Sequence, residues 1–311
     1  MNGIQIGFMW GLSTAQVGEL EASAVDSLWA GGHVASRNPG QEAMVALARL
    51  SSITQRVRVG TSVLLLPLYP PAIIAKQVAD LDRLTGGRIT LGVGIGGEYP
   101  AEFEACQVPL GERGARTNEA IDLMRKLWTA EEVDHDGPFF PMRRVRIHPA
   151  PVQAGGPRII VGGRKEPAMR RAALRGNGWM PYLYSPRRYA KSVATIREFA
   201  AKANRNLDGF EWCAFVFTNA HPDRERAREE AAKFLGGNYA QNFDEMIGSV
   251  AAVGSPDEVR ARLQQFVNVG ARHLILVPAT RDAAGAWDVI RRVLDEVVPG
   301  VGLTPATVPN R

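Results

Sequence analysis

Residues 57–98 constrain the possible folds of this chain more than any other stretch. The segment opens with the apolar run VRVGTSVLLL, which has no helical period and predicts a strand buried on both faces, as in parallel sheets. Pro70 and Pro71 then suit the start of a helix, where a missing N–H costs nothing, and an apolar stripe follows over about two turns. Two glycines end that helix, and residues 88–93 predict a second buried strand. The segment therefore predicts a strand, a helix and a parallel strand.

Glycines and one carboxylate gather at the carboxyl end of the second strand: Gly94, Gly96, Gly97 and Glu98. Ligands of parallel α/β folds bind at this end of the sheet. Gly92, Gly94 and Gly97 also match the G-x-G-x-x-G pattern of dinucleotide-binding folds, but that pattern should open a helix, and the EYP that follows is not expected to do so. Two interpretations stay open: the glycines form only a tight turn, or they let a planar cofactor approach the backbone closely.

The rest of the chain continues the alternation of strands and helices without a linker. Eight short apolar runs are predicted as strands: 3–9, 25–30, 57–66, 88–93, 159–163, 179–183, 210–220 and 273–277. Amphipathic or well-capped segments between them predict helices, the best defined being 41–53, 114–130 and 185–202. Eight alternating units favour a closed (β/α)8 TIM barrel of the α/β class over an open sheet. We expect one domain over residues 1–298.

Three stretches depart from this alternation. Residues 131–157 are rich in proline and longer than an ordinary connection, which predicts an inserted lid or binding loop. Residues 236–252 match no element clearly. Residues 299–311 are proline-rich and predict a loose carboxyl-terminal tail.

Composition and charge narrow the functional classes. The chain is 45% hydrophobic and 22% charged, and neither a signal sequence nor an apolar run of about eighteen residues is present, so we expect a cytoplasmic protein without a membrane partner. The net charge is +5 at pH 7, but the arginines are scattered over the predicted helices, so nucleic acid is not an expected partner. Cys106 and Cys213 form no disulfide framework, and the cysteines and histidines show no metal-ligand spacing.

A candidate anion site follows the fifth predicted strand. Gly162, Gly163 and Arg164 stand just before a predicted helix over residues 167–175. Free amides at a helix N-terminus together with a guanidinium bind phosphate well. A simple glycine turn is the alternative interpretation. A P-loop is excluded, because the chain contains no G-x-x-x-x-G-K-[ST].

Two other groups stand at predicted strand ends. His33 follows the second strand, where an imidazole could move a proton near neutral pH, although a structural role is the alternative. Aromatic side chains at or near the end of the sixth strand are candidates to line the substrate side: Trp179, Tyr182 and Tyr184. Core packing is an equal alternative for Trp179.

A known family matches several segments of this chain. Its motifs resemble TSVLLLPLYPPAIIAKQVADLDRLTGGRITLGVGIGGE, ERGARTNEAIDLMRKLW, DGPFF, IIVGGRKEPAMRRAALRGNGWMP and VGSPDEVRARLQQFVNVGARHLILV. The ordered set is similar to that of the bacterial luciferase-like superfamily of flavin- and coenzyme F420-dependent oxidoreductases, and it covers nearly the whole chain. The resemblance implies a barrel with an inserted lid, often a homodimer, and a cofactor that lies across the carboxyl ends of the strands.

The resemblance also implies a cofactor wall. Members often have a non-prolyl cis peptide in the third strand, against the isoalloxazine or deazaflavin ring, and here it would fall at Ser62–Val63. The family's phosphate or cofactor-tail site maps onto Gly162-Gly163-Arg164. The implied wall consists of Gly32, Ser62, Val63, Gly96, Gly97, Gly162, Gly163 and Arg164.

The proton-handling residues implied by the resemblance are His33 and Glu98. Deazaflavin-dependent members often carry Asp-His after the second strand, whereas this chain has Gly32-His33 and lacks the Asp. A Trp found a few residues later in sugar-phosphate dehydrogenases of the family is absent, and Arg37 stands near that place, which argues against a sugar-phosphate substrate. Glu98 matches an acidic residue that donates or accepts a proton in such enzymes.

The activity implied by the resemblance is hydride transfer between coenzyme F420 and a small organic substrate. An alternative is an FMN-dependent monooxygenase that receives reduced flavin from a partner reductase and uses oxygen. A further alternative is a non-catalytic flavin-binding relative. The excess of arginine over lysine would suit the phosphate and polyglutamate tail of F420. Such an excess is also typical of proteins from GC-rich genomes.

Overall fold

The computed structural model describes residues 3–9, 11–36, 40–239, 241–280 and 282–302. Arg37 and the last nine residues of the predicted tail lie outside these ranges. The chain divides into two compact units. The central unit consists of residues 11–182 and 192–211, and the terminal unit of residues 1–10, 183–191 and 212–311.

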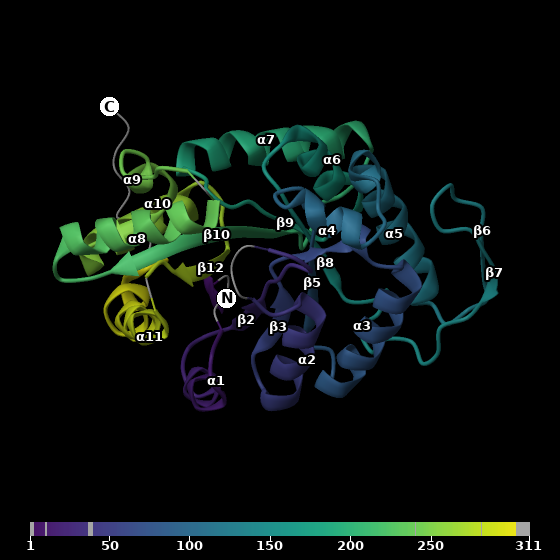
Figure 1. Ribbon diagram of the computed structural model, residues 1–311, viewed down its shortest axis with the longest axis horizontal. Coiled ribbons are helices and arrows are strands. Elements are labelled where there is room, and N and C mark those ends of the chain that lie inside the picture. Colours follow the sequence, from purple (N-terminus) through teal and green to yellow (C-terminus); the bar gives the residue numbers. More distant parts are fainter. Residues whose placement is uncertain (1–2, 10, 37–39, 240, 281, 303–311) are drawn as a thin grey trace. The chain divides into compact units, whose positions relative to one another are not determined.

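Five neighbouring parallel strands form the sheet of the central unit (Figure 1). In spatial order they are β2 (Ser27–Ala30), β3 (Arg58–Thr61), β5 (Ile89–Gly94), β8 (Arg158–Gly162) and β9 (Gly178–Met180). A short strand, β4 (Leu64–Leu65), extends the pairing with β5. Every residue of β5 is buried, as expected for a strand covered on both faces. The strands predicted from the apolar runs are thus present, each within a few residues of its predicted ends.

Helices connect these strands, and local sequence explains where they begin and end. They are α1 (Thr14–Glu21), α2 (Ala43–Ile53), α3 (Pro71–Thr85), α5 (Arg113–Leu127), α6 (Glu166–Arg175) and α7 (Pro186–Lys202). Helix α3 starts with Pro71 at N1 and buries the predicted stripe that includes Ile74 and Val78. It ends at Gly86, whose φ of 64° is the left-handed conformation that glycine adopts without a Cβ penalty.

The terminal unit holds four parallel strands in the order β11, β10, β12, β1. Their bounds are β11 (Ala252–Gly254), β10 (Glu211–Ala220), β12 (His273–Pro278) and β1 (Gln5–Met9). Its helices are α8 (Arg224–Tyr239), α9 (Ile247–Val250), α10 (Pro256–Asn268) and α11 (Ala283–Arg292), followed by a π-helical turn (Val293–Val297) and a 3-10 turn (Val298–Gly300). Ser255 and Glu258 form a capping box at the start of α10, because they exchange side-chain and backbone hydrogen bonds there.

Eight of these strands alternate with helices along the chain and give it the fold of a TIM barrel, as predicted. They are β1, β2, β3, β5, β8, β9, β10 and β12. Residues 236–252, which matched no element in the sequence, contain the end of α8, the short helix α9 and the first residue of β11. The description of residues 1–298 as a single domain stays a prediction.

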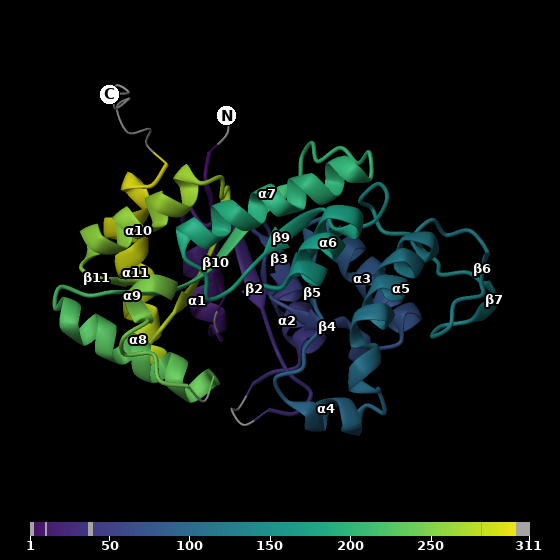
Figure 2. The same ribbon diagram turned by 90° about the horizontal axis from the view of Figure 1, so that it is seen from above.

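The insertion at residues 131–157 contains an antiparallel hairpin that the proline-rich sequence did not predict. It consists of β6 (Val133–His135) and β7 (Met142–Val145), and Figure 2 shows it beside α5. Glu119 on α5 holds the hairpin, since its carboxylate accepts from the backbone N–H groups of Phe139 and Phe140 and lies 3.1 Å from His135 Nε2. The hairpin is therefore tied to the helix that precedes it.

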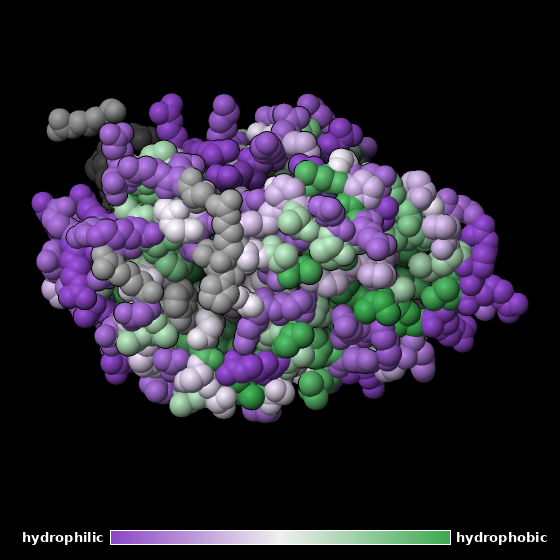
Figure 3. All heavy atoms as spheres, in the orientation of Figure 1, coloured by the Kyte–Doolittle hydropathy of each residue, from purple (hydrophilic) through white to green (hydrophobic). Residues whose placement is uncertain are grey.

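Short apolar segments make up the core, and the surface is mainly polar. No helix in the described part of the chain is long and apolar enough to cross a membrane. Hydrophilic residues cover most of the face drawn in Figure 3. The large hydrophobic side chains that are exposed are Val34, Val45, Ile73, Leu84, Leu110, Val152 and Met246.

A buried carboxylate on α3 fixes the far end of the insertion. Asp82 is 0% exposed. Its carboxylate accepts from the backbone N–H groups of Val152 and Gln153 at 2.9 and 3.0 Å, and from the side-chain amide of Gln153 at 2.6 Å. Buried donors are costly when they lose such an acceptor. Asp82 is therefore the residue through which α3 sets the path of the chain into β8.

We predict that Asp82→Ala lowers the free energy of unfolding by about 3 kcal/mol, because it leaves three donors without their acceptor. Denaturant unfolding measures the loss, and hydrogen exchange at the amides of Val152 and Gln153 localises it. Asp80→Ala is the matched control, since Asp80 is on the same helix, 52% exposed, and pairs only with Lys76 among the described residues. Its expected effect is within about 0.5 kcal/mol. Equal losses in the two variants would contradict the role given to Asp82.

Candidate active site

The predicted site residues converge at one edge of the central sheet. Parallel strands bring their carboxyl ends to the same edge. Five neighbouring strands each contribute a residue or segment just beyond their ends: His33 after β2, Ser62–Val63 after β3, Gly96–Glu98 after β5, Gly162–Arg164 at the end of β8 and Tyr182 after β9. Residues that are far apart in the sequence are therefore brought to one edge of the sheet.

The peptide bond between Ser62 and Val63 is cis, which confirms the conformation expected there. The backbone N–H of Ser62 donates to the carbonyl of Ala30, at the end of β2, over 2.7 Å. The hydroxyl of Ser62 is buried and, within the described residues, has no hydrogen-bond partner. A buried hydroxyl ordinarily has a partner, so this one suits a ligand that supplies the missing group.

Two glycines, one on β5 and one on β8, make room for the side chain of Val63. A Cβ at Gly94, the last residue of β5, would lie 2.5 Å from Val63 Cγ2. A Cβ at Gly162, the last residue of β8, would lie 2.9 Å from Val63 Cγ1. Both distances are shorter than packed carbon atoms tolerate. Gly94 and Gly162 are therefore required by packing around Val63, which explains part of the glycine cluster.

The glycines after β5 shape the loop rather than contact Val63. Gly96 and Gly97 have φ angles of 62° and 117°, which favour glycine. A Cβ at Gly97 would also lie 3.3 Å from the Nε of Arg113, at the start of α5. That Nε is buried and has no hydrogen-bond partner within the described residues. Arg113 is a site-proximal residue that the sequence analysis missed.

His33 pairs with a carboxylate that the sequence analysis also missed. Its Nδ1 lies 3.3 and 3.2 Å from the two carboxylate oxygens of Glu102, which is 0% exposed. The imidazole also meets the ring of Tyr99 edge-on, with ring centroids 4.9 Å apart. The side chain of His33 is 30% exposed, so the imidazole is not enclosed by these contacts.

Glu102 reaches His33 because a short helix, α4 (Pro100–Ala105), follows the glycine loop. The expectation that no helix would open there is wrong. Pro100 stands at N1, where its missing N–H costs nothing, so EYP is a helix start rather than a break. The N1 proline was the signal that could have placed Glu102 in the first turn, next to the loop.

Glu98 belongs to a second network. The hydroxyl of Tyr182 donates to its carboxylate over 2.7 Å, and the guanidinium of Arg164 lies 4.5 Å from the centre of the Tyr182 ring. Burial, and then the negative charge of Glu98, raise the pKa of Tyr182 to about 12, against the opposing effect of Arg164. The phenol is therefore protonated at neutral pH and acts as the donor to Glu98.

The loop after β8 turns at Gly163 and leads into α6. Gly163 has a φ of 132°, and its carbonyl accepts from the indole N–H of Trp179 over 3.0 Å. Helix α6 follows with Lys165 as its N-cap residue and with no side-chain hydrogen bond to its first amides. Arg164 and Lys165 add positive charge there, and Glu166 in the first turn adds a negative one. The balance favours an anion.

Two of the three predicted substrate-side aromatics have other surroundings. Trp179 is 0% exposed, and its indole N–H donates to the carbonyl of Gly163, which agrees with the core-packing alternative. Tyr184 is 2% exposed, and the guanidinium of Arg188 lies 4.3 Å from its ring centroid. Tyr182 is the predicted aromatic that the structure brings to the other site residues.

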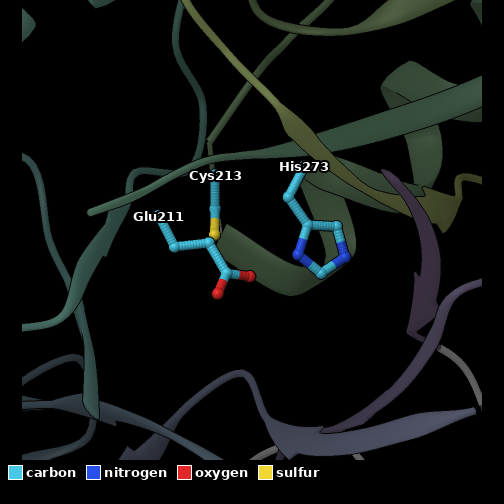
Figure 4. Close-up of side chains that lie close together, drawn as sticks. All are labelled: Glu211, Cys213 and His273. Atoms are coloured by element: carbon cyan, nitrogen blue, oxygen red, sulfur yellow. The ribbon is translucent and has the colours of Figure 1, made fainter. Parts of the chain in front are cut away.

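Figure 4 shows a second group of polar side chains: Glu211, Cys213 and His273. Glu211 and Cys213 are two residues apart on β10, and His273 is the register partner of Cys213 on β12. The carboxylate of Glu211 already accepts hydrogen bonds from the guanidiniums of Arg58 and Arg158. Two guanidiniums beside the carboxylate oppose a metal cation, so we interpret the arrangement as part of an ion-pair network.

Known proteins are similar to this chain in sequence. A family model described as luciferase-like monooxygenase matches residues 13–273. The F420-dependent glucose-6-phosphate dehydrogenase of Mycobacterium tuberculosis (strain ATCC 25618 / H37Rv) is 30% identical over 289 residues, which cover 82% of this chain and 84% of that protein. An uncharacterized protein of the same strain is 35% identical over 181 residues, covering 55% of this chain and 62% of that protein's length.

Two solved structures have the same fold. One is an F420-dependent secondary alcohol dehydrogenase in complex with an F420-acetone adduct, with a TM-score of 0.82 and 20% identity over 96% of this chain and 99% of that chain. The other is a type II Baeyer-Villiger monooxygenase from Pseudomonas putida in complex with FMN, with a TM-score of 0.78 and 18% identity over 97% of this chain and 99% of that chain. At these identities the likeness establishes the fold alone.

We predict that Gly94→Ala lowers the free energy of unfolding by about 1–3 kcal/mol, since its Cβ would overlap Val63. Combining it with Val63→Ala, which removes the overlapping methyl groups, should recover at least about 1 kcal/mol relative to the sum of the two single changes. A double-mutant cycle by denaturant unfolding measures this coupling. Gly111→Ala is the control, because a Cβ there meets no atom within 4 Å. Strictly additive losses would refute the packing account of Gly94.

Proposed function

Because this chain belongs to the luciferase-like monooxygenase family, we propose that it is an oxidoreductase that transfers hydride between coenzyme F420 and a small organic substrate. The observation that carries the proposal is the convergence of the buried hydroxyl of Ser62, an imidazole–carboxylate pair and a cationic turn at one edge of the sheet. Its sequence relatives at 30% identity include F420-dependent dehydrogenases.

The residues at the end of β3 fit the ring of such a cofactor. Val63 stands between positions that have no side chain, Gly94 and Gly162, so a flat ring could lie against it. The hydroxyl of Ser62 needs a hydrogen-bond partner, and a deazaflavin or flavin carries several polar ring atoms. We assign Gly32, Ser62, Val63, Gly96 and Gly97 to this ring-binding wall.

The turn after β8 fits an anionic cofactor tail. Arg164 and Lys165 stand at the start of α6, whose first amides have no side-chain cap. A phosphate would gain charge-assisted hydrogen bonds from the amides and from the guanidinium. We therefore assign Gly162, Gly163 and Arg164 to the tail, as expected from the sequence.

Two groups handle protons in this proposal. When bound, F420 supplies a deazaflavin that accepts or donates hydride at the substrate carbon. His33 takes the proton of a substrate hydroxyl, or returns one to a carbonyl oxygen, depending on the direction of the reaction. Glu98, exposed and held by Tyr182, orients a polar group of the substrate or accepts a proton. Tyr182 is the aromatic that we assign to the substrate side.

The second candidate function is that of an FMN-dependent monooxygenase, which would receive reduced flavin from a partner reductase. The observation that favours it is the similarity in fold to an FMN-bound monooxygenase. The wall at Val63 would accept either ring, because it meets the ring face. The imidazole–carboxylate pair favours proton handling during hydride transfer and disfavours a non-catalytic flavin-binding relative. A homodimer, a cytoplasmic location and a lid role for residues 131–157 stay predictions.

We predict that the purified protein binds oxidised F420 with a Kd on the order of micromolar or tighter, and FMN at least about tenfold more weakly. Fluorescence quenching and calorimetry measure both constants, and Arg164→Ala should weaken F420 binding more than it weakens binding of a tail-free deazaflavin. Stronger binding of FMN, particularly reduced FMN, would replace the proposal with the monooxygenase.

We predict that His33→Ala lowers turnover by about 100-fold or more, because general acid–base catalysis contributes on this scale. Its F420 affinity should change by less than about threefold, since the imidazole acts on the substrate. Val34→Ala, a change at an exposed neighbour in the same loop, is the control and should keep turnover. Unchanged turnover in His33→Ala would remove His33 from the mechanism.

A further inference from the structure

We propose that Glu102 is a positioning residue that holds neutral His33 with its proton on Nδ1, so that Nε2 is the atom that exchanges a proton with the substrate. This inference rests on the proposed function for its catalytic meaning. Its structural part, the tautomer of His33, is independent of any cofactor.

The geometry of the pair sets the direction of the hydrogen bond. The Nδ1 of His33 lies 3.3 and 3.2 Å from the two oxygens of Glu102, at a comparable distance from each. An ionised carboxylate only accepts hydrogen bonds, so the nitrogen that faces it carries the proton. The hydrogen bond made by one ring nitrogen decides the state of the other, and Nε2 is left with a lone pair.

The burial of Glu102 makes this pairing energetically significant. Glu102 is 0% exposed, and among the described residues its carboxylate has no lysine or arginine partner. Burying a carboxylate without a partner is costly, so the contact with His33 is its main compensation. In turn, the short helix α4 fixes Glu102, because Pro100 starts the helix and Phe103 packs against Leu65 and Leu68.

The titratable neighbours of Glu102 do not neutralise it. Burial raises the pKa of the Cys106 thiol, and the charge of Glu102 raises it further. Burial, and then the hydrogen bond to Glu42 and the charge of Glu42, raise the pKa of the Tyr69 phenol, and the charge of Glu102 adds a smaller effect in the same direction. Both groups are therefore uncharged near neutral pH. The hydroxyl of Tyr69 donates to Glu42, on a different element, over 2.6 Å. Tyr99 contacts the ring of His33 edge-on.

The pair then works as follows during oxidation of an alcohol. The C–H bond of the substrate breaks with its electron pair, which leaves as hydride for the oxidised deazaflavin of the proposed function. The hydroxyl proton passes to Nε2, and the carbon and oxygen form a carbonyl. The imidazolium that results keeps its Nδ1–H directed at Glu102, whose negative charge stabilises the new positive charge. Reduction of a carbonyl runs through the same atoms in reverse.

A purely structural role for Glu102 is the competing explanation, in which the contact only anchors the loop that carries His33. The two differ in their readouts. Anchoring would be satisfied by any hydrogen-bond acceptor, whereas stabilisation of the imidazolium requires the negative charge. Glu102→Gln keeps the size of the side chain and an amide oxygen and removes the charge. Glu104→Gln, at an exposed position on the same helix, is the matched control.

The first measurement is the tautomer of His33 in the protein without cofactor, by nitrogen-15 NMR of the imidazoles. The signal of His33 is assigned by its loss in His33→Asn. We expect the proton on Nδ1 in the native chain and in Glu104→Gln, and loss of that preference in Glu102→Ala. A proton on Nε2 in the native chain would overturn the proposal, whatever the outcome for F420.

The second measurement is the pH profile of F420-dependent turnover in the variants that fold, as judged by circular dichroism. We expect Glu102→Gln to lower kcat by at least about tenfold, with KM and F420 affinity within about twofold. The acid limb of its kcat/KM profile should move to lower pH, because the negative charge that favours the imidazolium has been removed. A profile and kcat equal to those of Glu104→Gln would overturn the positioning role.

Failure of the native protein to bind F420 would instead count against the proposed function, because the NMR result stands without it.

Discussion

The side chain of Val63 is the packing constraint on which the rest of the site depends. It occupies the space that side chains would fill at Gly94 and Gly162, the last residues of β5 and β8, so both of these strands end in glycine. With those positions empty of side chains, the carboxyl edge of the sheet presents backbone and one branched aliphatic group. A surface of this kind suits a flat ring better than a branched ligand. The valine at position 63 therefore requires glycine at positions 94 and 162.

The charged groups of the site form two networks that the chain keeps apart. His33 and Glu102 make one, in which a buried carboxylate faces an imidazole. Glu98, Tyr182 and Arg164 make the other, in which an exposed carboxylate accepts from a phenol that lies under a guanidinium. The adjacent residues Glu98 and Tyr99 connect them through the backbone. Because the two carboxylates have different partners, the proposed function gives each of them a different task.

Much of the architecture could be predicted because it follows from local rules. Buried parallel strands are continuous apolar runs, N1 prolines and capping boxes begin helices, and Gly86 ends one. The convergence of the strand ends then follows from the fold class. The pairing of His33 with Glu102 could not be predicted, since it joins residues 69 positions apart and depends on the exact start of α4. The sequence also could not decide whether Trp179 and Tyr184 are buried. An aromatic side chain at a strand end faces the core or a ligand according to contacts between distant residues, which no local pattern records.

The choice between F420 and FMN depends on residues away from the wall. Val63 would meet the face of the ring, and that face has nearly the same shape whether position five is carbon or nitrogen. Motifs that build the wall therefore indicate the family and say little about the cofactor. Both cofactors carry a phosphate, but F420 continues into a polyglutamate tail with several further negative charges. This difference in charge would act on three cationic side chains: Arg164 and Lys165 at the start of α6, and Arg113 beside Gly97. In the proposed function, selectivity for F420 is therefore an electrostatic property of the loops after β5 and β8, and the hydride chemistry follows from the ring that those loops retain.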